Sequence, residues 1–410
     1  MDKKIKMLVI PSDRTGVGKF RSVAPHVYLA EHYADLFDID IIYDIPNTNL
    51  EEFLKQYDLI HIHKQLDKEC QVMDMIKFLD IKVIIDVDDC PDLGEHHPMS
   101  LSAKKENWKG PILDHVRKAD YVTTTTPIFA KWLSKYNKNV IVLPNAIDPN
   151  EKQYQPHKNP RPGGRIRFGL ICGSSHFHDI ELLSGIARQI PENKLDKMQL
   201  VLCGFDTNGT RTIYYYDTGK VERRPIEPHE SVWCRYEEIL TNNYSIVSPE
   251  HKEFLLKYEK NTDDPFENEP YRRFWTRDIN QYASHYDNVD VILAPLKECE
   301  FNEMKSQLKV IEAGFMDTAI IAQDFGAYTI DLKSVIGKNG VIDETGNAML
   351  VDSAKNHKQW AKYIMKIVDN PELIDIMKSN LVPMVKETYS AEAVAKKRVE
   401  AYLKILDIER

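Results

Sequence analysis

Residues 290–326 read DVILAPLKECEFNEMKSQLKVIEAGFMDTAIIAQDFG, and this stretch decides the fold. The apolar runs at 289–296 and 319–322 have the length and the β-branched content of buried strands. Between them, residues 305–315 carry apolar side chains at helical spacings of three and four. A strand, a helix and a second strand in this order predict a parallel βαβ unit.

The same alternation of strands and helices runs through most of the chain. Further strands are expected at 5–10, 39–43, 59–63, 83–87, 121–124, 140–143, 166–172 and 200–203. Amphipathic segments of helical length separate most of the early ones, at 21–33, 70–78, 111–118 and 128–136. The predicted fold class is therefore α/β, with two Rossmann-like doubly wound domains whose carboxyl-terminal strand edges face a central cleft.

A polar segment divides the two domains. Residues 148–164 read DPNEKQYQPHKNPRPGG and have no apolar periodicity, which indicates a linker. We expect an N-terminal domain at 1–150, a linker at 151–164 and a C-terminal domain at 165–385. The second domain carries a polar and aromatic insertion at about 205–288, and a helix at 386–410 is expected to pack back on the first domain.

Composition excludes several classes of protein. With 410 residues, of which 42% are hydrophobic and 29% charged, the chain can bury large cores and is not disordered. Its apolar runs are too short for a transmembrane helix, and from residues 1–13 we expect no secretory signal. Six scattered cysteines suit a reducing cytosol, so we expect a cytoplasmic protein. A net charge of −9 argues against a protein that coats nucleic acid, although a local basic groove stays open.

Two loops of the first domain hold candidate site residues. Residues 12–21 read SDRTGVGKFR and place Gly16 and Gly18 directly before a helix, where backbone amides can approach a phosphate or a sugar. A tight turn that needs positive φ explains these glycines equally well. Asp88 and Asp89 follow the strand at 83–87, where clustered carboxylates usually serve a ligand hydroxyl, a cation or an arginine.

Residues 173–179 of the second domain read GSSHFHD and follow its first strand. Gly173, Ser174 and His176 can offer backbone amides and a hydroxyl to a diphosphate, and His176 should lie near Asp179 in the first helical turn. A serine that caps the helix is the plainer explanation, and both roles are compatible.

The loop and helix at 302–312 are the most informative site candidates. Asn302 opens the loop, and the expected helix places Lys305, Lys309 and Glu312 on one face. Lysines near a helix start suit phosphates, and a carboxylate can accept both hydroxyls of a ribose. Ser306 adds a hydroxyl to the same loop. A salt-bridged, solvated helix face is the structural alternative.

Together these segments resemble the GT-B nucleotide-sugar glycosyltransferases, and among them the retaining group called family four. Residues 290–326 resemble the donor-site strand, loop and helix of that group. Residues 142–148, VLPNAID, and 119–127, ADYVTTTTP, resemble the end of its first domain. The loops at 16–21 and 173–179 match a subset of its members. The segments span nearly the whole chain in the expected order.

The resemblance implies an enzyme that moves a sugar from a nucleoside-diphosphate sugar, most simply a UDP- or GDP-sugar, to an acceptor hydroxyl with retention of configuration. The N-terminal domain would hold the acceptor and the C-terminal domain the nucleotide. Glu312 would bind the ribose, while Lys305 and Lys309 would meet the diphosphate. The family's first glutamate is replaced by Met304. Because lysines and helix dipoles can stabilise the leaving group, no obligatory metal or other cofactor is expected.

Where the family often has a histidine after the fourth strand, this chain has Asp88 and Asp89, which become the candidate catalytic residues. His61 and His63 alternate along the preceding strand, so at most one is expected to face the site.

Other functions and acceptors stay open. A nucleotide-sugar epimerase or phosphorylase has the same architecture, and an idle module that binds a glycan or a nucleic acid would explain Met304. The acceptor is either a glycan or a hydroxymethylated DNA base. The insertion carries a set of aromatic and basic residues that can stack on sugars or on extruded bases: Trp233, Arg235, Tyr236, Tyr271, Arg272, Arg273, Trp275 and Arg277. These residues, above all Trp233 and Trp275, can equally form the core of the insertion.

Overall fold

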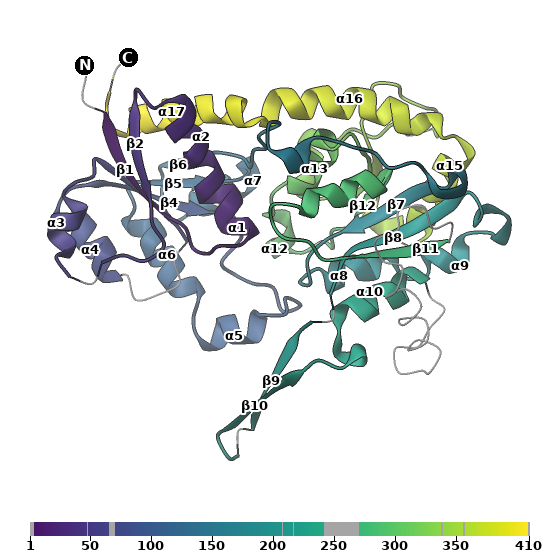
Figure 1. The fold of residues 1–410 in the computed structure, drawn as a ribbon, viewed down its shortest axis with the longest axis horizontal. Helices are drawn as coiled ribbons and strands as arrows, with labels where there is room; N and C mark the ends of the chain where they lie inside the picture. Colours follow the sequence, from purple (N-terminus) through teal and green to yellow (C-terminus); the bar gives the residue numbers. More distant parts are fainter. Residues whose placement is uncertain are drawn as a thin grey trace. The chain divides into compact units, whose positions relative to one another are not determined.

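The structure is a computed structural model that describes residues 4–46, 48–64, 70–206, 208–215, 217–241, 270–337, 339–355 and 357–408. The chain divides into two compact units. Unit 1 contains Met1–Glu151, Glu298–Ile311 and Met384–Arg410, and unit 2 contains Lys152–Lys297 and Glu312–Pro383. Each unit contains one six-stranded parallel sheet flanked by helices (Figure 1), so the predicted α/β class with two Rossmann-like domains is confirmed.

The sheet of unit 1 has the order β2-β1-β3-β4-β5-β6, and all its strands are parallel. The strands are β1 (Ile5–Ile10), β2 (Phe37–Ile41), β3 (Leu59–His63), β4 (Lys82–Val87), β5 (Tyr121–Thr124) and β6 (Val140–Val142). The chain moves from β1 to β2 and then crosses to β3 on the other side of β1. This reversal places a topological switch point between β1 and β3, where ligands of such sheets usually bind.

The first helix of unit 1 is built from three consecutive segments. These are α1 (Gly16–Gly18), a π-helical stretch (Lys19–Val23) and α2 (Ala24–His32). The remaining helices of the unit are α3 (Leu50–Leu54), α4 (Cys70–Phe78), α5 (Ser100–Lys105), α6 (Lys109–Lys118), α7 (Pro127–Leu133), α12 (Glu300–Glu303) and α17 (Ala391–Ile405). Two helices cross the boundary between the units, α13 (Leu308–Phe315) after Ile311 and α16 (Glu372–Tyr389) after Pro383.

Both faces of the unit 1 sheet are covered. Met7 and Val9 of β1 pack with Leu29 of α2 and Tyr402 of α17. The alternate residues of β1 point to the opposite face, where the core includes side chains of α4, α6 and α7. Strands buried on both faces need nearly continuous apolar sequence, which explains the pattern of short apolar runs in this half of the chain.

Unit 2 repeats the architecture, with the strand order β11-β8-β7-β12-β13-β14. Its strands are β7 (Ile166–Ile171), β8 (Met198–Phe205), β11 (Tyr271–Trp275), β12 (Val291–Ala294), β13 (Ala319–Gln323) and β14 (Met349–Val351). Its helices are α8 (Phe177–Ile180), α9 (Ile186–Gln189), α10 (Val232–Thr241), α14 (Tyr328–Asp331) and α15 (Lys358–Asp369). The switch point of this sheet lies between β7 and β12.

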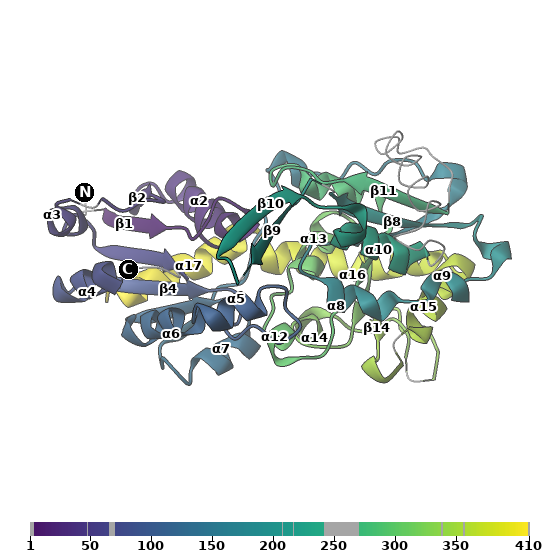
Figure 2. The same ribbon diagram turned by 90° about the horizontal axis from the view of Figure 1, so that it is seen from below.

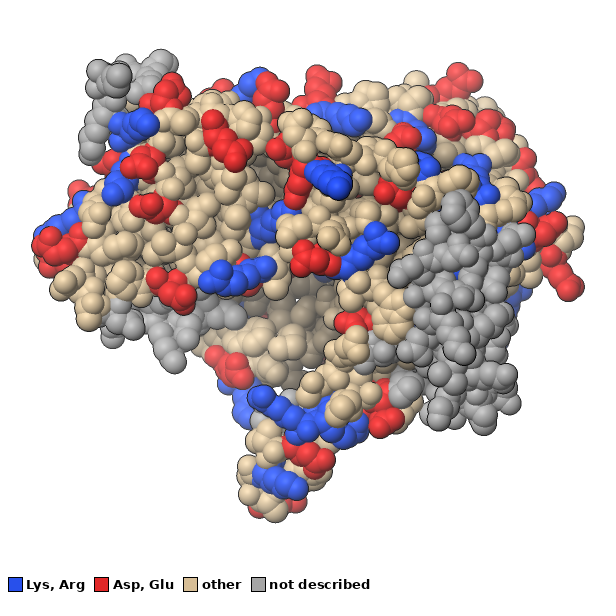
Figure 3. All heavy atoms as spheres, viewed as in Figure 1, with Lys and Arg blue, Asp and Glu red and all other residues tan. Residues whose placement is uncertain are grey.

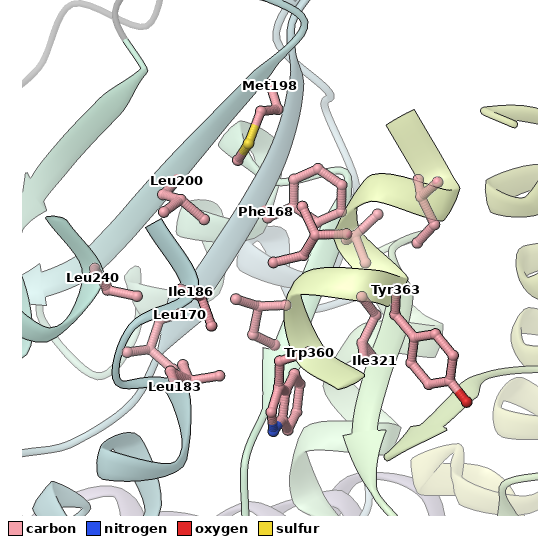
Figure 4. Close-up of a cluster of buried hydrophobic side chains, with 14 of the residues drawn as sticks. Phe168, Leu170, Leu183, Ile186, Met198, Leu200, Leu240, Ile321, Trp360 and Tyr363 are labelled. Atoms are coloured by element: carbon pink, nitrogen blue, oxygen red, sulfur yellow. The ribbon is translucent and has the colours of Figure 1, made fainter. Parts of the chain in front are cut away.

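A large hydrophobic cluster covers one face of the unit 2 sheet. Phe168 and Leu170 of β7, Ile186 of α9, and Trp360 and Tyr363 of α15 belong to one cluster of buried hydrophobic side chains (Figure 4). The hairpin β9 (Thr210–Tyr215) and β10 (Lys220–Pro225) forms a separate antiparallel sheet, outside this core (Figure 2).

Candidate functional site

One carboxylate organises the loop after β1. Asp13 Oδ1 accepts hydrogen bonds from the backbone amides of Thr15, at 2.7 Å, and Gly18, at 3.3 Å. Gly16 begins α1 beside it. Gly18 has a helical φ of −58°, so the explanation through positive φ is wrong for this residue. A Cβ atom there would lie 2.1 Å from the carbonyl oxygen of Asp13, and glycine is required because the two backbone segments touch.

His63 lies at the switch point of unit 1, at the end of β3. Its Nδ1 is 2.8 Å from Ser12 Oγ, and its Nε2 is 3.1 Å from Asp88 Oδ1. Lys64 Nζ lies 2.5 Å from the same Asp88 oxygen and 3.9 Å from Asp89 Oδ2. Burial works to raise the pKa of Asp88, but Lys64 and His63 outweigh it and lower that pKa well below its usual value. Asp88 is therefore an ionised member of a network, whereas the Asp89 side chain is 38% exposed.

His61 lies deeper in unit 1 than His63. Its ring packs against the ring of His26 at 4.7 Å, and its Nε2 is 4.0 Å from Asp86 Oδ2. His63 ends β3, whereas His61 lies two residues earlier in the strand. The expectation that alternation separates the two histidines is wrong, because residues two apart on a strand share a face. Burial lowers the pKa of His61 to about 3.

Arg21 joins three segments of unit 1, and the sequence analysis missed its role. It lies in the π-helical stretch and donates to Asp86 through Nε at 2.9 Å and Nη2 at 2.7 Å. Its Nη1 donates to Asn145 Oδ1 at 3.0 Å. Burial would raise the pKa of Asp86, but Arg21 outweighs this effect and lowers it to about 2. An aspartate inside an apolar strand was the available signal, since a buried carboxylate needs a cation.

Two motifs of the family resemblance meet within unit 1. Asn145, from the VLPNAID segment, donates through Nδ2 to Ser306 Oγ at 3.1 Å. Asn302 belongs to α12 and is buried, whereas the sequence analysis placed it in a loop. Lys309 lies in the first turn of α13.

Lys305 is not on α13, which begins only at Leu308. The expectation that Lys305 shares a helix face with Lys309 and Glu312 is therefore wrong. The chain leaves the helical path at Met304, whose side chain is buried in the core of unit 1 together with Phe301. Lys305 Nζ lies 5.1 Å from the centre of the Phe301 ring, a cation–π distance.

The edge of the unit 2 sheet at which β7 ends carries exposed small residues. Gly173 and Ser174 follow β7 and are exposed, and a Cβ atom at Gly173 would meet nothing within 4 Å. As expected, His176 Nδ1 lies 2.8 Å from Asp179 Oδ2. Asp179 Oδ1 also accepts from the backbone amide of Lys297 at 2.9 Å, which bridges the β7 and β12 ends. His176 is the N-cap of α8 without a side-chain cap bond, so the explanation through a capping serine is wrong.

Glu312 is buried in unit 2, with 1% of its surface exposed. Tyr286 donates its hydroxyl to Glu312 Oε2 at 2.8 Å, and Tyr282 donates to Oε1. Burial, followed by the charge of Glu312, raises the pKa of both tyrosines well above the usual value. The carboxylate thus has two neutral donors, which lie 30 and 26 residues before it in the chain. No local sequence pattern could have shown these partners.

The aromatic and basic residues of the insertion mostly form core. The buried members are Trp233, Tyr236, Tyr271, Arg272 and Arg273. Trp275 is partly buried against the same core, whereas Arg235 and Arg277 are exposed. Trp233 and Trp275 thus have a structural role, but in the main core of unit 2, whereas a separate core of the insertion was expected.

The hairpin β9–β10 carries charges of both signs, as the face in Figure 3 shows. Arg211 and Arg224 both pair with Glu230, and Lys220 lies 4.0 Å from Glu222. A basic groove is therefore not found on this hairpin.

Within the described part of the chain, no three His, Cys, Asp or Glu side chains gather in a way that could hold a metal ion. The expectation that the site needs no metal stays a prediction. None of the helices in the described ranges is long and apolar enough to cross a membrane.

No protein-family model and no curated protein matches the sequence. Solved structures do match over the full length. Sucrose-phosphate synthase from Thermosynechococcus elongatus has a TM-score of 0.62 at 14% identity, with 99% of this chain and 100% of that chain covered. HepE from Anabaena in complex with UDP has a TM-score of 0.59 at 11% identity, with 98% and 100% covered.

The chain has the GT-B fold. A third solved structure, an alpha-glucosyltransferase in complex with UDP and a 13-mer DNA containing a HMU base, matches with a TM-score of 0.55 at 10% identity. The coverage is 97% of this chain and 99% of that chain. At these identities the comparisons establish the GT-B fold, which the sequence resemblance implied.

Proposed function

We propose that this GT-B protein transfers a sugar from a nucleoside-diphosphate sugar to an acceptor hydroxyl. The observation that carries the proposal is the fold of residues 290–326. They form β12, α12, α13 and β13 in the order that the resemblance requires, with a buried carboxylate, Glu312, on α13. Two solved structures with the same fold over their full length contain UDP, which supports a UDP-sugar as the donor.

The donor contacts are assigned residue by residue. Glu312 accepts hydrogen bonds from the ribose hydroxyls, and Lys305, Ser306 and Lys309 contact the diphosphate. Each carboxylate oxygen of Glu312 accepts one tyrosine hydroxyl, and a carboxylate offers about four acceptor positions in total. Glu312 also has a purely structural explanation, as the acceptor that holds Tyr282 and Tyr286.

Further donor contacts come from the exposed loop after β7 and from unit 1. Gly173 and Ser174 offer backbone amides and a hydroxyl. The His176 ring is oriented by the contact of Nδ1 with Asp179, and its Nε2 donates to the diphosphate when the ring is doubly protonated. From unit 1, Asn302 and the loop of Gly16 and Gly18 belong to the same set of predicted contacts. Fixed donors of this kind stabilise the leaving diphosphate without an obligatory metal. Retention of configuration is part of the proposal and follows from the family resemblance.

Of the two candidate catalytic aspartates, Asp89 suits the acceptor better. Asp88 is engaged by His63 and Lys64, whereas the Asp89 carboxylate is more exposed and 3.9 Å from its nearest cation. Asp89 then orients the acceptor hydroxyl, and Asp88 fixes the strand end beside it. The acceptor is a glycan or a hydroxymethylated DNA base, the second supported by the DNA in one neighbour structure. We propose that the protein is cytoplasmic. The cysteines with described side chains are free thiols, which suits a reducing compartment.

The direct test is incubation with a panel of UDP- and GDP-sugars. A transferase binds one of them and releases the nucleoside diphosphate slowly, and an acceptor of the right class accelerates release. Product formed without an added acceptor, or from phosphate and a glycan, supports the epimerase or phosphorylase alternative. Absence of both binding and release throughout the panel contradicts the proposal and favours a binding module.

A further inference from the structure

Four polar side chains in unit 1 form one line across its switch point. Ser12 Oγ donates to Asp13 Oδ2 at 2.7 Å, and the same oxygen is 2.8 Å from His63 Nδ1. On the other side of the ring, His63 Nε2 is 3.1 Å from Asp88 Oδ1. The imidazole thus lies between two carboxylates, one reached directly and the other through a hydroxyl.

Counting hydrogens assigns a charge to this line. A serine hydroxyl has a single hydrogen, and Asp13 accepts it. The contact between Ser12 and His63 therefore needs a hydrogen on Nδ1, and the contact with the carboxylate of Asp88 needs a hydrogen on Nε2. An imidazole with both hydrogens is an imidazolium, and either neutral tautomer leaves one of the contacts between two acceptors.

Both terminal carboxyls are ionised, so neither supplies the missing hydrogen. Burial works to raise the pKa of Asp13, but hydrogen bonds from Thr15, Ser12 and Gly18 outweigh it and lower that pKa. Lys64 and His63 likewise lower the pKa of Asp88 against the effect of burial.

The neighbouring charges are consistent with a cation at His63. Lys64 pairs with Asp88, and Arg21 pairs with Asp86. His61 lies two residues before His63 in β3, and its Nε2 is 4.0 Å from Asp86 Oδ2. Burial lowers the pKa of His61, so its ring stays neutral. If His63 is counted as positive, the charges of Asp13, His63, Asp88 and Lys64 add up to zero.

We propose that His63 is a positioning residue, doubly protonated in the folded protein, that fixes the glycine loop of residues 12–18 to the ends of β3 and β4. Asp13 is the link, because its second oxygen holds the amides of Thr15 and Gly18. When His63 loses a proton, Ser12 turns its hydroxyl toward the ring or the contact with Asp88 breaks, and the loop loses one of its fixed points. The relevance of this loop to sugar transfer rests on the proposed function, but the proton count does not.

One amide reports on the loop. Val17–Gly18 is the one Val-Gly pair in the sequence, so protein labelled with carbonyl-¹³C valine and ¹⁵N glycine gives a single HNCO signal, that of Gly18. Labelling of the histidine rings with ¹⁵N gives a signal for His63, which is assigned because it is lost in His63→Gln. We expect the Gly18 amide to shift with pH at the same midpoint as the His63 ring.

Ser12→Ala separates a positioning role from a merely structural one. This variant removes the link to Asp13 and leaves the contact with Asp88, so the His63 ring should still titrate while the Gly18 step is lost. His32→Gln, at an exposed histidine of α2, is the matched control and should leave the Gly18 step unchanged.

A His63 ring that holds one proton throughout the range where the protein is folded overturns the proposal. So does a Gly18 step that survives in Ser12→Ala. The measurement uses the protein without ligand, so a failure to bind any nucleotide sugar leaves its result intact.

Discussion

The switch points of the two units are bridged in different ways. In unit 1 the bridge is ionic and buried: Arg21 pairs with Asp86, and His63 connects Ser12 to Asp88. In unit 2, Asp179 holds a backbone amide across the gap, and the loop after β7 stays exposed. One edge is thus organised by its own charges, while the other leaves small residues and amides available. The difference favours ligand contacts on the unit 2 loop and a positioning role for the charges of unit 1.

The largest expected difference between the two units is the loss of unfolding free energy when a buried charge is removed. Asp86→Ala leaves Arg21 buried without its carboxylate, and breaking such a pair costs about 3–5 kcal/mol of unfolding free energy. Glu312→Gln in unit 2 should cost less, because a glutamine oxygen can still accept a hydrogen bond from a neutral hydroxyl such as those of Tyr282 and Tyr286. Amide hydrogen exchange of each unit, measured over a series of urea concentrations, gives the change in unfolding free energy for both variants. Equal losses for the two variants would remove the distinction between the edges.

The two glycine loops should also respond differently. Gly18→Ala forces a Cβ to within 2.1 Å of a carbonyl oxygen, so the loop must shift at a cost of about 1–3 kcal/mol. Gly173→Ala meets open space and should change stability by no more than about 0.5 kcal/mol. Thermal unfolding of both variants provides the comparison. A destabilised Gly173→Ala would show that the unit 2 loop is less open than described.

Acid should weaken unit 1 through its buried histidines. The pKa of His61 is about 3 in the folded protein and near 6.5 when unfolded, so its contribution is present above pH 6.5 and is lost as the pH falls toward 3. The loss approaches about 1.4 kcal/mol per pH unit for one such group. His61→Met should flatten this dependence between pH 6.5 and 4, measured as the urea midpoint of unit 1. An unchanged slope would mean that other groups govern acid unfolding.

A pH dependence of the opposite sign is expected in unit 2. Burial raises the pKa of Glu237 to about 7, against the opposing charge of Arg273. A raised carboxyl pKa contributes stability that is full below about pH 4.5 and is lost as the pH rises through 7. Glu237→Gln keeps the shape and cannot titrate, so it should lose less stability than the wild type between pH 4.5 and 7. A parallel dependence in both proteins would contradict this assignment.

The fold could be predicted because parallel strands buried on both faces require apolar runs, and residues 289–294 and 319–322 are such runs. The helix start was misplaced at Lys305 because burial of Met304 ends α12, which is a tertiary effect. Arg21 was missed because its partners, Asp86 and Asn145, lie 65 and 124 residues away. Asp86 inside an apolar strand indicates that a cation is needed, but contacts of such range depend on the finished sheet, so the sequence does not show which cation.

The central claim is that the Glu312 carboxylate contacts the ribose of a nucleotide, and calorimetric titration with UDP tests it most directly. Glu303→Gln, at an exposed carboxylate in α12, is the matched control. We predict that the wild type and Glu303→Gln bind UDP alike, while Glu312→Gln remains folded and loses at least about tenfold in affinity, or about 1.4 kcal/mol. A folded Glu312→Gln that binds UDP as tightly as the wild type would contradict the claim and leave Glu312 as the structural partner of Tyr282 and Tyr286.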